Sequence, residues 1–274
     1  MPKRLIINSD DYGRTPEVSR GIRESHLRGV VTSTTCMMNI PTTPADIAIA
    51  LRETPKLGLG VHLVLTADAP LLKHDSVKSI TDEKGNFLKL GVLVERINSI
   101  DVKEVKNEWH AQIKAFVRAA GRNPTHLDSH HHTSYFSPAL IRAMLELAQE
   151  FGCGIRLPNV HGSDEMAGLP SSLIGPINEY APKLLKEFDP PRPDAFFASF
   201  YDELATRKEL KRIVAEIDEG TFEIMCHPGY IDPTLLAASS YAKQREVELE
   251  VLTDPAIKQD ILSHHIELIS FADL

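Results

Sequence analysis

Residues 4–27, RLIINSDDYGRTPEVSRGIRESHL, contain the pattern that decides the fold. The run Arg4–Ser9 is apolar enough for a buried strand. Thr15 followed by Pro16 is typical of a helix start, because the threonine side chain caps the first turn and proline needs no amide donor there. Apolar residues then recur at helical spacing until Gly29. The stretch therefore predicts a strand, a turn that carries two aspartates, and a helix.

The same alternation continues along the 274 residues of the chain. Further strands are predicted at Ser33–Met38, Leu57–Leu65, Thr125–His130, Ile155–Leu157, Ala195–Phe200, Thr221–Cys226 and Ile266–Phe271. Helices are predicted after Thr43–Pro44, after a capping box formed by Asp101 and Glu104, after Ser137–Pro138, near 203–219 and near 240–264. We expect an α/β fold: residues 1–274 form a single-domain (β/α) barrel, TIM-barrel-like, with seven or eight parallel strands. An open doubly wound sheet fits less well, because no Gly-rich phosphate turn follows the first strand.

Two irregular segments interrupt this pattern. Residues 66–100 carry charges and only brief apolar runs, so we expect a loop-rich insertion. It could close over a substrate as a lid, with the barrel core formed outside it, or it could be a packed loop or a dimer contact. Residues 159–193 contain six prolines, so any helix in this second loop-rich insertion is expected to be interrupted.

Composition excludes several classes of protein. The formal net charge of −8 argues against a nucleic-acid binder, which needs a basic face. The three cysteines are odd in number and show no CxxC spacing, so neither a disulfide framework nor a zinc ribbon is supported. The N-terminus lacks the apolar run of a signal peptide, and no stretch is apolar enough for a membrane span. We therefore expect a cytoplasmic protein without membrane partners.

Titratable residues collect at the carboxyl ends of four predicted strands. They are Asp10, Asp11, His62, Asp128, His130 and His227. The carboxyl ends of barrel strands meet at one rim, where barrel enzymes hold their active sites. Two imidazoles and one carboxylate suit a divalent transition metal, a description that His62, His130 and one of the two aspartates meet. The other aspartate could then act as general base on metal-bound water.

Each of these residues also has a purely structural interpretation. Residues 10–13 could simply form a turn, and His62 could be a hydrogen-bonded core histidine. In the triplet from His130 to His132, strand alternation places His131 on the opposite face. Two other functions remain open: phosphoester hydrolysis, which usually needs two ions, and a non-catalytic phosphosugar-binding module. Non-haem iron oxygenation shares the two-histidine, one-carboxylate ligand set, but its His…Asp order and jelly-roll context are absent. Serine hydrolase chemistry is not supported, because the chain has no GxSxG motif.

Five blocks in this order carry a family resemblance. They are LIINSDDYG (5–13), VTSTT (31–35), LGVHLVLT (59–66), PTHLDSHHH (124–132) and MCHPGY (225–230). Together they resemble the motifs of the YdjC-like carbohydrate deacetylases. The resemblance implies a barrel-like fold, frequent homodimers, and metal-dependent removal of acetyl groups from N-acetylated sugars such as chitooligosaccharides or their phosphorylated forms.

The resemblance also implies roles for individual residues. It makes Asp11, His62 and His130 the ligands of one divalent ion, Mg²⁺ or Zn²⁺. It makes Asp10 the base and His227 the acid. Asp128 is the candidate to orient a site histidine through a hydrogen bond. Thr133 and Ser134 follow the histidine triplet where close relatives often have a small apolar residue and another histidine, which leaves the identity of the sugar open.

Overall fold

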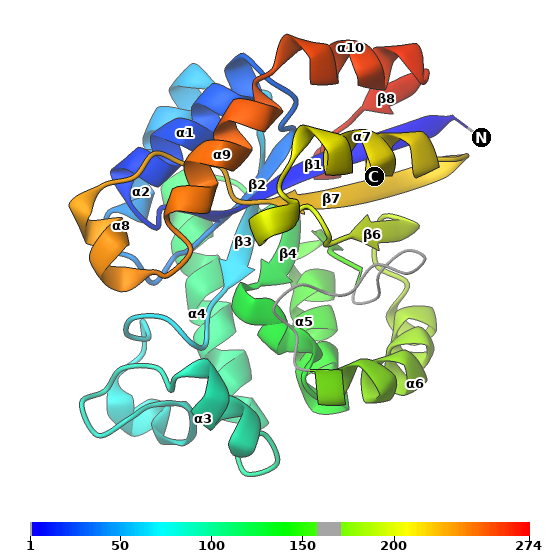
Figure 1. Ribbon diagram of the computed structural model, residues 1–274. Helices are drawn as coiled ribbons and strands as arrows, with labels where there is room; N and C mark the ends of the chain where they lie inside the picture. The colour runs from blue at the N-terminus through cyan, green and yellow to red at the C-terminus, as the bar shows by residue number, and fades with distance from the viewer. Residues whose placement is uncertain (1, 158–170) are drawn as a thin grey trace.

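The computed structural model describes residues 2–157 and 171–274, in which parallel strands form one curled sheet (Figure 1). The strands are β1 (Lys3–Tyr12), β2 (Ser33–Cys36), β3 (Gly58–Leu63), β4 (His126–Ser129), β5 (Gly154–Ile155), β6 (Ala195–Phe197), β7 (Gly220–Cys226) and β8 (Ile266–Leu268). Their order is β5-β4-β3-β2-β1-β7-β6, and β8 pairs with the first residues of β1. Within the described ranges no ladder joins β5 to β6, so the sheet curls as an open barrel. The expected (β/α) barrel-like fold with parallel strands is confirmed.

Helices surround this sheet, and several of them pack against one another. They are α1 (Pro16–Leu27), α2 (Thr43–Glu53), α3 (Leu90–Glu95), α4 (Val102–Ala120), α5 (Pro138–Phe151), α6 (Ser171–Phe188), α7 (Arg207–Glu216), α8 (Pro233–Ala238), α9 (Lys243–Leu252) and α10 (Pro255–Ser263). The predicted cap of α1 is confirmed, because the Thr15 side chain accepts a hydrogen bond from the Val18 amide. Contacts of α2 with α4, α4 with α5 and α5 with α6 extend this outer layer.

Tertiary contacts override the sequence signals at two helix starts. Thr43 was the expected cap of α2, but its hydroxyl donates to Met37 O at 2.8 Å and the helix begins without a side-chain cap. The prediction of a capping box at the start of α4 is also wrong. Glu104 accepts instead from the amide and hydroxyl of Ser79, because the 66–100 segment packs against the start of the helix. Asp101 still caps α4 through the Lys103 amide.

Two helical predictions need correction. The helix expected near 240–264 is divided into α9 and α10, because Asp254 and Pro255 start a new helix. The expected interruption of helix in 171–188 is wrong, since α6 runs through both Pro176 and Pro182. Each proline removes only one helical hydrogen bond, and burial of Ile177, Ala181, Leu184 and Leu185 stabilises the helix. The expectation for 159–170 lies outside the described residues.

The 66–100 segment is integrated into the core. It contains two short 3₁₀ helices, η1 (His74–Ser76) and η2 (Lys78–Ile80), followed by α3. Val77, Ile80 and Leu93 are fully buried in the main hydrophobic cluster. The expectation that the core lies outside this segment is therefore wrong.

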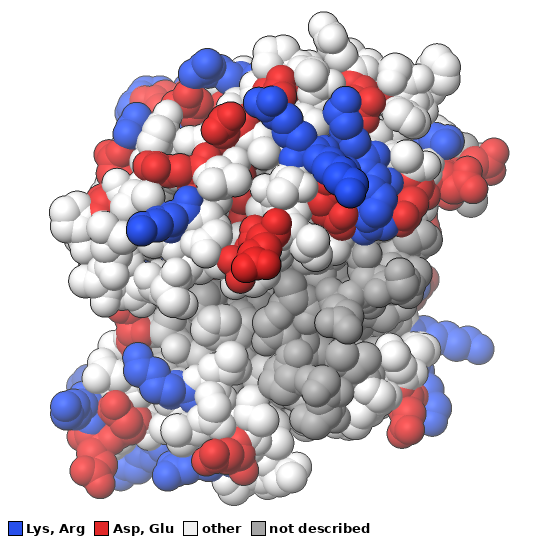
Figure 2. Space-filling model, in the orientation of Figure 1, with Lys and Arg blue, Asp and Glu red and all other residues white. Residues whose placement is uncertain are grey.

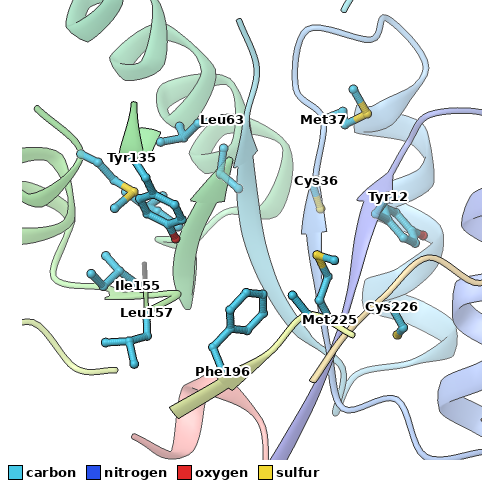
Figure 3. Close-up of a cluster of buried hydrophobic side chains, with 14 of the residues drawn as sticks. Tyr12, Cys36, Met37, Leu63, Tyr135, Ile155, Leu157, Phe196, Met225 and Cys226 are labelled. Atoms are coloured by element: carbon cyan, nitrogen blue, oxygen red, sulfur yellow. The ribbon is translucent and has the colours of Figure 1, made fainter. Parts of the chain in front are cut away.

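The enclosed side of the sheet is partly apolar and partly polar. Figure 3 shows part of the apolar core, in which Phe196 of β6 and Met225 of β7 project into the enclosed space. Phe196 faces the guanidinium of Arg156 with 4.9 Å between the guanidinium carbon and the ring centroid. Apolar side chains thus hold buried charged groups in fixed positions inside the barrel.

The outer surface carries charges of both signs. On the face drawn in Figure 2, acidic and basic side chains are interspersed over the described residues, with a group of basic side chains near α7. No helix in the described part of the chain is long and apolar enough to cross a lipid bilayer.

Candidate functional site

A cavity of about 650 Å³ opens at the carboxyl ends of the strands. Its volume falls in the range of small-molecule sites. Five of the six predicted site residues line it: Asp10, Asp11, His62, His130 and His227. Asp128 is fully buried beside it and contacts His62. The structure therefore brings together residues that are up to 217 positions apart in sequence.

A distortion of β1 allows the adjacent aspartates to face the same cavity. On a regular strand, Asp10 and Asp11 would point to opposite faces of the sheet. Asp11 adopts a left-handed φ of 67°, and the register between β1 and β2 shifts between Ser9 and Tyr12. Such an irregularity redirects a side chain at a strand end, so both carboxylates reach the cavity.

Asp11, His62 and His130 form a group that could hold a divalent cation. Asp11 Oδ1 lies 3.4 Å from His62 Nε2 and 3.2 Å from His130 Nδ1. This oxygen is buried and accepts no hydrogen bond, whereas Asp11 Oδ2 accepts from Arg245. A buried carboxylate oxygen without a donor needs another partner, and a cation between the three ligand atoms would supply it.

Asp128 fixes the orientation of His62. Its Oδ1 lies 2.7 Å from His62 Nδ1, and its Oδ2 accepts from the Thr35 hydroxyl at 3.0 Å. The Nε2 atom of His62 is therefore directed toward Asp11. Burial alone would lower the pKa of His62, but the carboxylates of Asp128, Asp10 and Asp11 together raise it to about 9, with Asp128 contributing most. A cation that bound His62 Nε2 would displace this proton.

Arg156 is the residue that holds Asp10. The guanidinium donates to both oxygens of Asp10, at 2.8 and 2.7 Å, and lies 3.0 Å from Asp128 and 2.8 Å from Glu223. Burial would raise the pKa of Asp10, yet Arg156 keeps it well below its usual range. Burial raises the pKa of Glu223 to about 7, although Arg156 partly opposes that rise. Asp10 is thus a fixed, ionised carboxylate.

His227 lies directly after β7 and approaches Asp10. Its Nε2 is 3.9 Å from Asp10 Oδ2. Its ring packs edge-on against the rings of Tyr201 and Tyr241, with 5.5 Å between the ring centroids in each pair. The amide of His227 donates to Glu248 of α9. Burial lowers the pKa of His227 to about 4, so the imidazole is neutral near pH 7.

The histidine triplet does not alternate as a strand would. Strand β4 ends at Ser129, and His131 and His132 both adopt left-handed φ values, of 53° and 55°. His131 therefore lines the cavity beside His130 and His132, and the prediction that it points to the opposite face is wrong. The Thr66 hydroxyl contacts His131 Nδ1 at 2.9 Å, which connects this turn to the start of the 66–100 segment.

Comparison with known proteins now identifies the family. A family model described as YdjC-like protein matches residues 4–263. The chain belongs to the YdjC-like family. A "Carbohydrate deacetylase" of Brevibacillus brevis is 37% identical over 272 residues, covering 99% of each chain. A "Chitooligosaccharide deacetylase" of Yersinia enterocolitica is 33% identical and covers 100% of each chain.

A solved structure has the same fold. A protein of Enterococcus faecalis V583, provisionally described as a cellobiose-phosphate cleavage protein, superposes with a TM-score of 0.89 at 33% identity. The match covers 100% of this YdjC-like chain and 99% of the other.

Sequence reasoning missed several polar residues of this YdjC-like site. Arg156 lies between two apolar residues of a predicted strand, and a charge in that position could have indicated an inward-facing partner for a carboxylate. Asn8 and His126 alternate with Asp10 and Asp128 along their strands, which is also a visible signal. Arg245 and Glu248 come from α9, and no spacing in the sequence connects them to the aspartates and His227.

Proposed function

We propose that this chain is a hydrolase that removes the acetyl group from an N-acetylated carbohydrate with the help of one divalent metal ion. The observation that carries the proposal is the buried Asp11 Oδ1, which accepts no hydrogen bond and lies 3.4 and 3.2 Å from ring nitrogens of His62 and His130. The names of the relatives from Brevibacillus brevis and Yersinia enterocolitica support an acetylated carbohydrate, chitooligosaccharides included, as the substrate class.

Asp11, His62 and His130 would hold the ion. When bound there, a divalent ion would polarise the acetyl carbonyl and lower the pKa of a water molecule. Two imidazoles favour Zn²⁺ and its neighbours, while the carboxylate also suits Mg²⁺. A second group of potential ligands, Asp10, His62 and Asp128, shares His62, and Arg156 binds both of its carboxylates. This sharing favours one ion over the pair that phosphoester hydrolysis usually needs.

Asp10 and His227 would move the protons. Asp10, held ionised by Arg156, orients the attacking water and takes a proton from it. His227 is neutral, and its Nε2 lies 3.9 Å from Asp10 Oδ2, so it can relay that proton to the departing nitrogen. Water adds to the carbonyl carbon, the C–N bond breaks, and the nitrogen gains the proton. The products are acetate and a free amino sugar.

Metal analysis combined with an acetate-release assay tests this proposal. The purified protein is expected to contain close to one divalent ion per chain and to release acetate from N-acetylated sugars, and a chelator should abolish that release. His62→Ala and His130→Ala should each lose the ion, because each removes one of three protein ligands. His110→Ala is the matched control, since the half-exposed His110 of α4 contacts Glu150 and the Phe151 ring and does not line the cavity. Full metal occupancy in both site variants, or no acetate from any acetylated sugar, would contradict the proposal.

A further inference from the structure

A buried chain of contacts extends from Asp10 to the C-terminal tail. His126 Nε2 contacts Asn8 Oδ1 at 2.9 Å, and Asn8 Nδ2 donates to Asp10 Oδ1 at 2.9 Å. The His126 ring stacks on Phe271, with 3.7 Å between the ring centroids and 5° between the ring planes. Phe271 lies in η5 (Phe271–Asp273), at the very end of the chain. Three side chains, those of Phe271, His126 and Asn8, thus connect the tail to the candidate base.

The chemistry of Asp10 fixes the direction of every hydrogen bond in this chain. Asp10 Oδ1 accepts from Arg156 at 2.7 Å and from Asn8 Nδ2 at 2.9 Å, so the amide oxygen of Asn8 faces His126. The Nε2 atom of His126 must then carry the hydrogen. Burial and the nearby Arg156 charge keep the pKa of His126 well below its usual range, so the ring is neutral. Its Nδ1 therefore accepts from the Thr125 hydroxyl at 2.9 Å.

The surrounding backbone holds the His126 ring in this orientation. A Cβ atom at Gly60 of β3 would lie 2.6 Å from two ring atoms of His126, so a glycine is needed beside the ring. On the other side, Phe271 is fixed because its amide donates to the Ser33 hydroxyl at 3.0 Å. A capping box between Ser270 and Asp273 closes η5. The imidazole is therefore clamped between β3 and the tail.

We propose that Asn8 and His126, with Phe271 stacked on the His126 ring, are positioning residues that hold the Asp10 carboxylate for catalysis. The inference rests on the proposed deacetylase function. Asn8 and His126 are fully buried and neither lines the cavity, so they do not touch a substrate there. Their loss should lower kcat while leaving KM and the bound metal unchanged.

Three single variants and one double variant test this chain of contacts from Asp10 through Asn8 and His126 to Phe271, which we call the relay. His126→Phe keeps an aromatic ring but removes the donor, and kcat should fall about tenfold because a hydrogen bond that supports a charged group is lost. His126→Gln should recover part of that loss, because the glutamine amide can donate from a position close to that of Nε2. Asn8→Ala should lower kcat by a similar factor. The double variant Asn8→Ala/His126→Phe should be no slower than Asn8→Ala alone, because both changes break the same connection.

The tail is tested separately. Phe271→Leu keeps an apolar side chain but removes the flat ring, so kcat should fall severalfold with KM unchanged. Leu274→Ala is the control in the same tail, because Leu274 is 36% exposed and stacks on nothing in the relay. Circular dichroism and metal content establish that each variant is folded and loaded before kinetics are measured.

The outcomes separate this inference from the proposed function. If the wild-type protein releases no acetate from any acetylated sugar, the proposed function fails. If the wild type is active but Asn8→Ala, His126→Phe and Phe271→Leu keep its kcat, the relay is refuted. Equal losses in His126→Gln and His126→Phe, or in Leu274→Ala and Phe271→Leu, would also refute it. If His126→Phe does not fold, the kcat values of Asn8→Ala and Phe271→Leu test the relay without it.

Discussion

Replacing Arg156 by methionine should destabilise the protein strongly. Arg156 is fully buried and is the shared partner of three buried carboxylates, those of Asp10, Asp128 and Glu223. Methionine fills similar space without a charge, so Arg156→Met removes the positive charge while leaving all three acids in place.

The expected magnitude follows from the charges in this cluster. Breaking one buried ion pair by removing a single partner costs about 3–5 kcal/mol. Glu223 can bind a proton at little cost near pH 7, because burial already raises its pKa to about 7. His62, whose pKa is about 9, still pairs with Asp128. Asp10 is therefore the main carboxylate left without a positive partner. We expect Arg156→Met to lower the free energy of unfolding by about 3–5 kcal/mol.

Urea unfolding at two pH values measures this effect and its cause. Without the guanidinium, buried carboxyls have raised pKa values, so the folded state binds their protons and the stability they contribute is lost as pH rises. Arg156→Met should thus be less destabilised at pH 5.5 than at pH 7.5. Adding Glu223→Gln should recover part of the loss, because one uncompensated acid is removed. Acetate release should fall by about 10² or more, because Asp10 is no longer held ionised.

A surface pair supplies the control. Arg142 forms a comparable two-bond contact with Glu187, but both side chains are largely exposed, at 42% and 51%. Arg142→Met should change stability by less than about 1 kcal/mol. If Arg156→Met lowers the free energy of unfolding no more than Arg142→Met does, or by the same amount at both pH values, the interpretation of Arg156 as the electrostatic centre of the site is wrong.

Further predictions concern the two aspartates, a buried glutamate and a glycine. Asp10→Asn should retain the metal and lose turnover by about 10² or more, whereas Asp11→Asn should lose the metal; the opposite metal contents would reverse the two roles. Burial raises the pKa of Glu248 from 4.5 to about 7, so its stabilising contribution is complete below pH 4.5 and is lost as pH rises through 7. Glu248→Gln should remove about 3 kcal/mol of this pH dependence, measured by urea unfolding at pH 4.5 and 8, and an unchanged slope would contradict the prediction. Gly60→Ala should lower the free energy of unfolding by about 1–3 kcal/mol, because the new Cβ would lie 2.6 Å from the backbone carbonyl and the imidazole of His126. Gly91→Ala is the control and should leave the free energy of unfolding unchanged, because no atom lies within 4 Å of its new Cβ.

Local patterns in the sequence are sufficient for the strands and for the place of the site. Every predicted strand overlaps an observed strand, because a short apolar run between turn residues is typical of a buried strand. The bounds differ, since β1 continues past Ser9 to Tyr12 and β5 covers Gly154–Ile155 instead of Ile155–Leu157. Asp10, Asp11, His62, His130 and His227 line one cavity because the carboxyl ends of parallel strands meet at one edge.

The sequence was less informative wherever a distant segment competes for a local group. Glu104 belongs to a capping box by spacing, but it bonds to Ser79 because the 66–100 segment packs there. Pro176 and Pro182 are helix breakers by propensity, but α6 continues because its apolar side chains are buried. The turn after β4 is similar, since the left-handed His131 and His132 have no signal in the local pattern.

The sequence alone thus determined the secondary structure pattern, the parallel barrel-like sheet and the residue types that gather at its rim. Only the tertiary structure decided which groups are paired: Arg156 with Asp10, Arg245 with Asp11, and His126 with Asn8. The physical reason is that periodicity fixes the direction of a side chain within its own element. A hydrogen bond or an ion pair, in contrast, depends on distances between elements, which are set when the whole sheet curls and its helices pack.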